Sequence, residues 1–189
     1  MNKLIISTRS YDWINYTVGT ILLDPSFFSV MIILKDDDRS MCDCRNFCKQ
    51  SIYEQRKFDM FNVGKKLGIK KLMNLSYNAD SIDIGQLTAQ LQLYIMLSNI
   101  KEVYCQYNDT LAIILNNIKD KINMKVYFYN IEDNYKYTML IGKEFILDET
   151  KYSIKKEIEK LIVGYNTTNE LVLGKQVEKF YINHKRNDV

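Results

Sequence analysis

Short apolar runs alternate with amphipathic stretches along most of this 189-residue chain, and this alternation limits its fold more than any other feature. The runs are only a few residues long and rich in Ile, Val, Leu and Tyr, as buried parallel strands tend to be. Five strands are therefore predicted, over residues 4–7, 29–34, 71–75, 102–106 and 125–129.

The segments between these runs have helical periodicity, and helices are predicted over residues 15–23, 51–67, 84–100 and 110–122. A glycine directly after a helix commonly caps it, so Gly68 is expected to end the second helix. In the third helix, residues spaced by three and four form one face. These residues are Leu87, Leu91, Tyr94, Ile95 and Ser98.

Strand–helix alternation of this kind predicts an α/β fold with a Rossmann-like, doubly wound, mostly parallel sheet and right-handed crossovers. The chain has one proline, seven glycines and no low-complexity linker. We therefore expect a single domain over 1–189, with a core of 1–130 and a C-terminal extension of 131–189 packed on it. Ligands of such sheets bind outside the carboxyl ends of the strands, which directs attention to the loops at 8–16, 35–48, 76–83 and 107–110.

The charge balance argues against nucleic acid as a partner, because 26 basic and 23 acidic residues leave a net charge of only +3 and no basic stripe. No apolar stretch approaches the ~20 residues of a membrane span, and the first apolar run is too short for a signal peptide. A cytoplasmic protein without membrane contact is expected, with free thiols at Cys42, Cys44, Cys48 and Cys105. The abundance of Asn, Lys and Ile suggests an AT-rich genome, such as that of a phage or a low-GC bacterium.

The first strand and helix carry a resemblance to a known family. Residues 3–13, KLIISTRSYDW, are followed by 18–22, VGTIL. This is similar to the start of the LmbE/PIG-L family of zinc-dependent N-deacetylases, in which a strand enters His-Pro-Asp-Asp-Glu and a Gly-Gly-Thr-Leu helix follows.

Further segments resemble the family in the same order along nearly the whole chain. The loop Asp36–Asp38 is similar to the loop after its second strand, and Arg56 with Asp59 to its Arg-x-x-Glu helix. The remaining positions are Leu75, Asp80, Asp83, Val103, Tyr104, Asn108, Asp109, Thr110, Ile146, Asp148, Thr150, Lys155, Lys156, Tyr165, Glu178, Lys179 and Phe180.

The resemblance implies a zinc site, and the residues depart from it. The family holds zinc with two His and one Asp, and its other N-terminal Asp deprotonates the metal-bound water. Alignment on Gly19-Thr20 places Arg9 at the first His, Tyr11 at the base and Asp12 at the Asp ligand. Residues 111–114, LAII, stand at the family's His-x-Asp-His, and the single histidine, His184, lies in the polar tail. We therefore predict a degenerate member without a zinc cofactor, in which Asp12 is only a weak candidate ligand.

Two other sets of residues could hold a metal. Asp36, Asp37 and Asp38 suit a hard cation, but EF-hand spacing is absent and a solvated loop is the simpler interpretation. Cys42, Cys44 and Cys48 lack the paired C-x-x-C spacing of structural zinc sites, so ordinary thiols are favoured there.

A ligand-binding cluster is predicted at the strand ends. A guanidinium at Arg9 could bind a phosphate or carboxylate, and the rings of Tyr11 and Trp13 could stack on a base or sugar. Alternatively, Arg9 and Asp12 pair with each other, and Arg56 pairs with Asp59 within its helix. The full set of candidate ligand-binding residues is Arg9, Tyr11, Asp12, Trp13, Asp36, Arg56, Asn108 and Asp109.

The function favoured by these observations is a catalytically inactive deacetylase-like protein that binds an anionic sugar- or nucleotide-type small molecule for sequestration or regulation. One alternative is a metal-dependent N-deacetylase or amide hydrolase with a metal site rebuilt from Asp12 and Asp36–Asp38. Another is a structural or oligomerisation protein with a collapsed pocket, and assembly into a homo-oligomer stays open.

Overall fold

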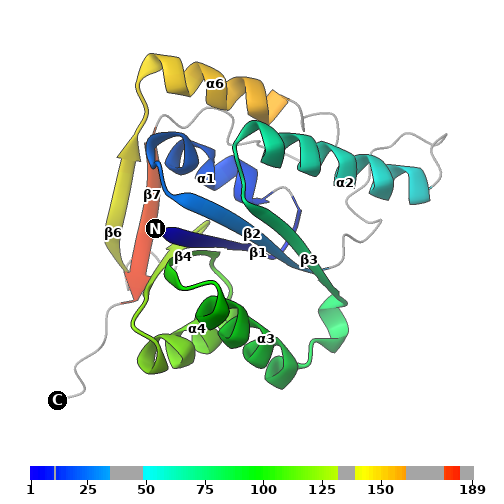
Figure 1. The fold of residues 1–189 in the computed structure, drawn as a ribbon, viewed down its shortest axis with the longest axis vertical. Helices are drawn as coiled ribbons and strands as arrows, with labels where there is room; N and C mark the ends of the chain where they lie inside the picture. The colour runs from blue at the N-terminus through cyan, green and yellow to red at the C-terminus, as the bar shows by residue number, and fades with distance from the viewer. Residues whose placement is uncertain (11, 35–48, 132–138, 161–176, 184–189) are drawn as a thin grey trace.

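A seven-stranded mixed sheet, in the order β3-β2-β1-β4-β5-β7-β6, forms the centre of the molecule (Figure 1). The structure is a computed structural model that describes residues 1–10, 12–34, 49–131, 139–160 and 177–183. The first five strands are mutually parallel, whereas β7 runs antiparallel to both β5 and β6. The strands are β1 (Asn2–Ser7), β2 (Phe27–Leu34), β3 (Lys71–Tyr77), β4 (Ile100–Gln106), β5 (Lys125–Tyr129), β6 (Met139–Ile146) and β7 (Val177–Asn183).

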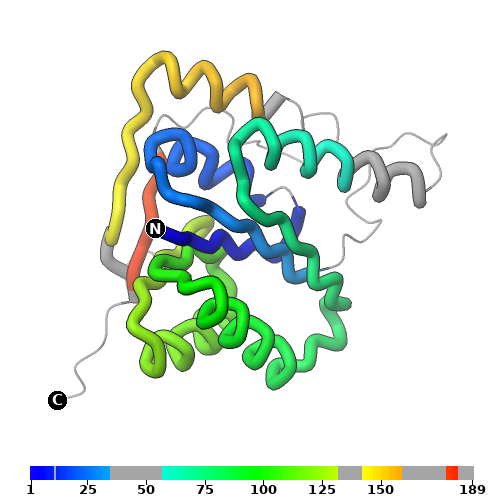
Figure 2. The backbone as a smooth tube through the Cα atoms, in the orientation of Figure 1, coloured from blue at the N-terminus to red at the C-terminus, as the bar shows by residue number. Residues whose placement is uncertain are grey.

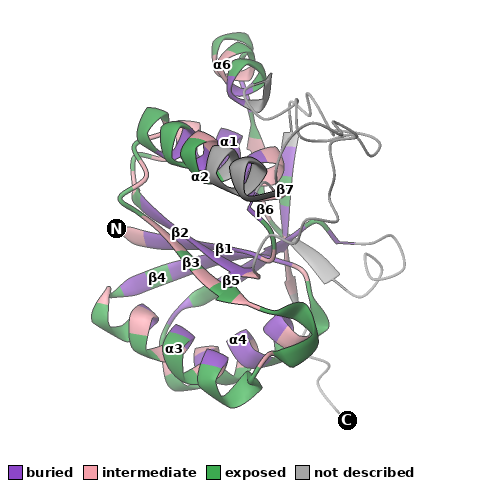
Figure 3. Ribbon diagram, turned by 90° about the vertical axis from the view of Figure 1, so that its right-hand side faces the viewer, coloured by how far each residue is buried: buried purple, intermediate pink, exposed green. Residues whose placement is uncertain are grey.

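Helices cover both faces of the sheet, as a doubly wound fold requires (Figure 3). On one face lie α1 (Asp12–Leu23), α2 (Lys49–Lys66) and α6 (Glu149–Lys160), and on the other α3 (Ile84–Leu97) and α4 (Asp109–Lys121). A single 3-10 turn, η1 (Ala79–Ser81), precedes α3. One apolar cluster packs beneath α3 and α4 and a second beneath α1 and α2, so the central strands are buried on both sides. The predicted fold class and the five predicted strands are confirmed.

The ends of the helices follow local capping rules. Gly68 adopts φ 68°, and the N–H groups of Gly68 and Ile69 donate to the carbonyls of Lys65 and Gly64, which is the Schellman arrangement. Helix α3 starts where the Asp83 side chain accepts from the N–H of Gln86. The sequence predicted that this helix continues to residue 100, but Asn99 turns the chain at φ 48° and β4 begins one residue later. The predicted apolar face is otherwise correct, since Leu87, Leu91 and Ile95 are buried.

A buried carboxylate connects the C-terminal segment to the first helix. Glu178 on β7 accepts hydrogen bonds from the N–H groups of Gly19 and Thr20, at 2.8 and 2.7 Å, and from the Thr20 hydroxyl at 2.7 Å. Lys155 on α6 donates to the same carboxylate at 2.6 Å and neutralises it. A methyl group on Gly19 would lie only 2.8 Å from Glu178 Oε1 and 2.9 Å from Leu147 Cδ1, so this close approach requires glycine.

Elements that are far apart in the sequence thereby become neighbours. Helix α6 packs against α1, and β7 enters the sheet between β5 and β6 (Figure 2). No helix in the described part of the chain has the length and apolar character to cross a membrane.

We expect Glu178→Gln to destabilise the protein strongly. The substitution removes the carboxylate charge with which the buried ammonium of Lys155, at 0 % side-chain exposure, forms an ion pair. Breaking a buried ion pair on one side typically costs ~3–5 kcal/mol. Urea denaturation followed by circular dichroism measures the change in the free energy of unfolding.

The matched control is Glu144→Gln. Glu144 on β6 pairs with Lys179 across 3.4 Å, and both side chains are exposed. Loss of such a surface pair is expected to cost at most ~1 kcal/mol. Equal destabilisation by the two substitutions would contradict the structural role given to Glu178.

Candidate functional site

A hollow of about 540 Å³ opens at the carboxyl ends of β1 and β4. These two strands are neighbours in the sheet, but the chain leaves β1 into α1 on one face and β4 into α4 on the other. This is the topological switch point of a doubly wound sheet, the place where such folds leave room for ligands. Its lining is mostly polar and consists of Thr8, Arg9, Asp12, Gln106, Tyr107, Asn108, Asp109 and Asn130.

Gln106, the last residue of β4, organises the floor of the hollow. Its side chain is buried, and Oε1 accepts from the N–H of Thr8 at 2.9 Å and from the Thr8 hydroxyl at 2.6 Å. The Ser7 hydroxyl also donates to Oε1, at 3.4 Å. Because Oε1 faces these donors, Nε2 faces the other way and donates to Asp12 Oδ2 at 2.9 Å. One side chain therefore joins the end of β1, the start of α1 and the end of β4.

Asp12 and Arg9 lie at opposite ends of the loop between β1 and α1. Asp12 is the first residue of α1, where the positive end of the helix dipole stabilises a carboxylate. Arg9 is exposed, and its backbone carbonyl accepts from the Ser7 hydroxyl at 2.7 Å. Within the described residues no ion pair joins Arg9 to Asp12, so the pairing considered as an alternative is not formed.

The start of α4 forms the opposite wall of the hollow. The Asn108 side chain caps this helix by accepting from the N–H of Leu111 at 3.2 Å. Asp109 accepts from the hydroxyl of Tyr107 at 3.0 Å. Both residues are exposed, so they present polar atoms to solvent beside Arg9 and Asp12 while they also hold the helix start in place.

The structure thus brings together four of the eight residues proposed from the sequence: Arg9, Asp12, Asn108 and Asp109. Tyr11 and Asp36 lie outside the described residues, as do Asp37, Asp38, Cys42, Cys44, Cys48 and His184. Arg56 belongs to α2, but the placement of its side chain is likewise not described.

The expectation for Trp13 needs correction. Its ring is fully buried in the apolar cluster beneath α1 and α2 and does not line the hollow. The reason is helical geometry: α1 begins at Asp12, and the next residue faces the sheet instead of the strand ends. A large aromatic ring on the buried face of a helix contributes to the core, and Trp13 does so here.

The segment 111–114 does not fill the hollow. Leu111, Ala112 and Ile114 pack into the apolar cluster beneath α4, and Ile113 points outward with 64 % of its surface exposed. The pocket collapse considered as an alternative therefore does not occur through these side chains. Cys105 is also in that cluster, where burial raises the pKa of its thiol well above the usual range.

Sequence reasoning missed Gln106, Thr8, Tyr107 and Asn130 as lining residues. Gln106 could have been noticed, because it is a polar residue at the end of the apolar run VYC. Its hydrogen-bond partners could not have been predicted from the sequence, because Thr8 and Asp12 are 98 and 94 residues away along the chain.

The described residues of the hollow do not match a zinc site. Zinc is held by thiolate, imidazole and carboxylate ligands, and the described part of the chain has no cluster of three His, Cys, Asp or Glu side chains. One oxygen of Asp12 already accepts from an amide N–H, and the guanidinium of Arg9 lies beside the same hollow. A positive charge at this place disfavours a dication.

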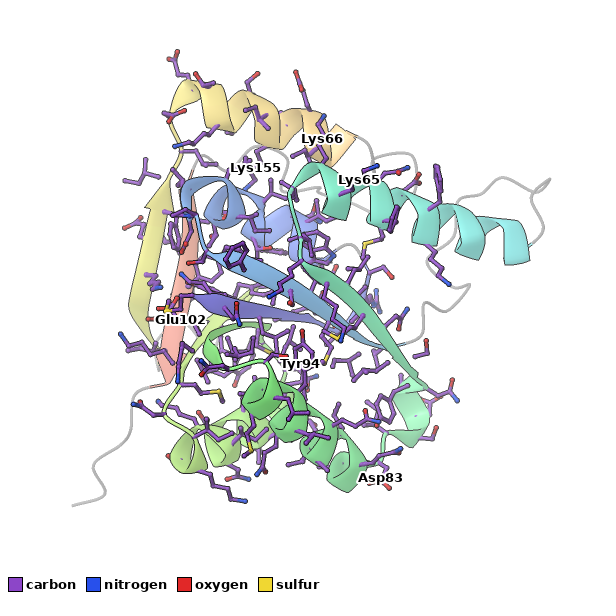
Figure 4. The ribbon with its side chains drawn as sticks, viewed as in Figure 1. Lys65, Lys66, Asp83, Tyr94, Glu102 and Lys155 are labelled. Carbon is purple, nitrogen blue, oxygen red and sulfur yellow. The ribbon has the colours of Figure 1, made fainter. Side chains whose placement is uncertain are left out.

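A second ionic cluster surrounds Glu102 on β4 (Figure 4). Its carboxylate pairs with Lys143 at 2.6 Å and Lys3 at 3.0 Å and accepts from the Tyr104 hydroxyl at 2.9 Å, while Lys3 also pairs with Asp24. Burial alone would raise the pKa of the Glu102 carboxyl, but the bonds from Lys143, Lys3 and Tyr104 outweigh it and lower this pKa. Burial and the adjacent Glu102 charge raise the pKa of the Tyr104 phenol well above its usual range.

This cluster has the properties of a structural network. Lys3 and Lys143 balance Asp24 and Glu102, so the four charges are internally compensated. None of the four lines the hollow at the strand ends. The hollow therefore remains the candidate functional site.

Comparisons with known proteins agree on the fold. No model of a known protein family matches the sequence, and no curated protein sequence matches it. Among solved structures, the N,N'-diacetylchitobiose deacetylase from Pyrococcus horikoshii is 13% identical with a TM-score of 0.65, over 96% of this chain and 84% of that one. The zinc-inhibited form of teicoplanin deacetylase Orf2 is 8% identical with a TM-score of 0.68, over 98% and 100%.

A third structure with the same fold has a different activity. The 4-carboxy-2-hydroxymuconate hydratase GalB from Pseudomonas putida KT2440 is 13% identical with a TM-score of 0.63, over 100% of this chain and 99% of that one. Identities this low establish the fold and leave the chemistry to the residues of the site. The chain therefore has an α/β fold like that of these deacetylases and of the hydratase, and the fold class predicted from the sequence is confirmed.

Proposed function

We propose that this deacetylase-like protein is not a hydrolase and that it binds an anionic, sugar- or nucleotide-type small molecule in the hollow at the ends of β1 and β4. The observation that carries the proposal is the contact between the Gln106 amide and the Asp12 carboxylate, with the exposed Arg9 beside it.

The charges of the hollow favour a ligand with one anionic group and several hydroxyls. Arg9 is the one cation among the described lining residues, and its donors suit a phosphate or carboxylate. Asp12 and Asp109 would repel a highly charged polyanion, but carboxylates accept well from sugar hydroxyls. The amides of Asn108 and Asn130 can both donate and accept.

The size of the hollow and one of its rings fit the same ligand class. A hollow of about 540 Å³ lies within the ~300–1,000 Å³ range of small-molecule sites. Tyr107 is half-buried, with its ring packed edge-on against Phe128 and its hydroxyl held by Asp109. A tyrosine held in this way offers a flat apolar face for a sugar or base at little cost in conformational entropy.

The hydrogen bonds of Asp12 argue against the family's chemistry. According to the family resemblance, Asp12 is the surviving metal ligand, with Arg9 and Tyr11 in the positions of a His ligand and of the base. Oδ2 of Asp12 accepts a hydrogen bond from the Gln106 amide, and Oε1 of the same amide accepts hydrogen bonds from Thr8. This network supplies no imidazole or thiolate donor. A metal site rebuilt from Asp12 and Asp36–Asp38 is the competing hypothesis, and the experiments below separate the two.

Purified protein is expected to contain no stoichiometric zinc, because the described hollow offers two carboxylates, Asp12 and Asp109, without an imidazole or thiolate, and has an adjacent guanidinium. Elemental analysis after dialysis against zinc, together with native mass spectrometry, measures the metal content. One tightly held zinc per chain that is lost in Asp12→Ala, but retained in Asp120→Ala on the distant end of α4, would show that a metal site exists.

No deacetylase turnover is expected on N-acetylglucosaminyl substrates such as N,N'-diacetylchitobiose. Tyr11 is a poor general base near neutral pH, because the unperturbed pKa of a tyrosine is about 10. Released acetate, assayed with and without added zinc, measures the activity. Turnover above background that disappears in Asp12→Asn would contradict the proposal and favour the rebuilt metal site.

Arg9→Ala is expected to weaken binding of a hexose phosphate or of ADP-ribose by about 1.5–3 kcal/mol, the usual contribution of a charged hydrogen bond. Isothermal titration calorimetry measures the affinity. Lys121→Ala is the matched control, because it removes one positive charge at the opposite end of α4. If no sugar phosphate or nucleotide binds, or if both variants weaken binding equally, the binding function is wrong.

A further inference from the structure

A second cleft, of about 440 Å³, lies at the opposite edge of the sheet, where β1, β2 and β3 begin and α3 ends. It shares no residue with the hollow at the carboxyl ends. The strand register explains how it is assembled: Ser29 on β2 lies beside Lys71 on β3, and Asn2 on β1 lies beside Ile100 on β4. The lining residues are Asn2, Ser29, Lys70, Lys71, Tyr94, Leu97, Ser98, Asn99 and Ile100.

Two ammonium groups of this cleft carry uncompensated charge. Lys70 lies over the ring of Phe27 at 5.6 Å, and Lys71 over the ring of Tyr94 at 5.2 Å (Figure 4 labels Tyr94). Neither lysine pairs with a carboxylate anywhere in the described part of the chain, and both are exposed. Rings attract the ammonium groups without neutralising them, so both charges remain available to an anion.

The polar atoms around the lysines favour the same ligand. Ser29 lines the cleft and is only 6 % exposed. Its hydroxyl can donate a hydrogen bond to a ligand oxygen.

The C-terminal end of α3 does not oppose an anion as strongly as a bare helix end would. The carbonyl of Ser98 accepts from Asn2 Nδ2 at 2.7 Å, which satisfies one of the terminal carbonyls. Beside it, Leu97 is 79 % exposed, and Phe27, next to Lys70, is 60 % exposed. The cleft therefore combines two cations and a hydroxyl with an apolar rim.

We infer that this cleft is a binding site for a phosphomonoester whose phosphate is attached to an apolar group. The phosphate lies between Lys70 and Lys71 and accepts from the Ser29 hydroxyl. The attached apolar group contacts Tyr94 and Leu97. Such a phosphate is carried either by a soluble aromatic or acyl phosphate or by the headgroup of phosphatidic acid.

Phenyl phosphate is the soluble probe, and calorimetry on the full chain measures its affinity, with benzyl alcohol as the uncharged comparison. Lys70→Gln, Lys71→Gln and Ser29→Ala are each expected to weaken binding, the lysine variants by about tenfold or more, as loss of a charged hydrogen bond predicts. Lys156→Gln is the matched control. Lys156 also lies over a tyrosine ring, that of Tyr152 at 4.3 Å, but on α6, which covers the other face of the sheet from α3.

The lipid source is tested by cosedimentation with phosphatidylcholine vesicles that contain or lack phosphatidic acid. Binding to the acidic vesicles that Lys70→Gln and Lys71→Gln abolish identifies a headgroup, and binding of phenyl phosphate alone identifies a soluble ligand. Either result supports the site. Arg9→Ala is expected to leave vesicle binding and the lysine-dependent part of phenyl phosphate binding unchanged, which keeps this cleft distinct from the proposed sugar-phosphate hollow.

Three results would overturn the inference. The first is that neither phenyl phosphate nor acidic vesicles bind. The second is that Lys156→Gln weakens binding as much as Lys71→Gln does, which would indicate a general charge effect. The third is that Arg9→Ala abolishes binding of phenyl phosphate while the lysine variants retain it, because the probe would then occupy the other hollow. Circular dichroism of each variant checks that it is folded.

Discussion

The buried carboxylate of Glu178 is the contact on which the arrangement of this fold most depends. It accepts from two backbone N–H groups and one hydroxyl of α1 and pairs with Lys155, so β7, α1 and α6 meet at one point. An unpaired charge at such a depth would be prohibitively unfavourable, and only the combined donors make its burial possible. The same contact explains why residue 19 is a glycine, because any side chain there would displace the carboxylate. By holding α1 in place, it also holds the helix start that frames the hollow.

Gln106 has a comparable role at the other end of α1. At the switch point its side-chain amide accepts from Thr8 and donates to Asp12, beside the exposed Arg9. The same fold supports deacetylases and a hydratase, so it does not by itself dictate a reaction. The hollow and the cleft of Lys70 and Lys71 lie at opposite ends of the strands, and each has exposed cationic side chains in its lining. Both are consistent with a protein that binds anions.

The strands and helices of the first 130 residues could be predicted because their signals are local. Apolar runs of strand length, and apolar residues spaced by three and four, indicate directly which side chains are buried. Gly68 indicates the end of its helix because glycine readily adopts the positive φ that a helix cap requires. The errors are also local in origin. The helical periodicity predicted that α3 extends to residue 100, but the positive φ of Asn99 ends the helix earlier. Trp13 was predicted to face a ligand because it follows the end of a strand, whereas it is buried. One step along a helix rotates a side chain by about 100°, which turned this ring into the core.

By itself, the sequence determined the fold class, the parallel order of strands and helices, and the absence of the family's His residues at the aligned positions. Only the tertiary structure decided which polar atoms meet. The Gln106 amide reaches Thr8 and Asp12 across more than ninety residues of chain, and Glu178 reaches Gly19 across 159. It also decided that β7 inserts between β5 and β6 and that Ser29 lies beside Lys71. The physical reason is that periodicity encodes how each residue relates to its near neighbours, whereas a hydrogen bond between distant segments depends on strand order and register, which no local pattern contains.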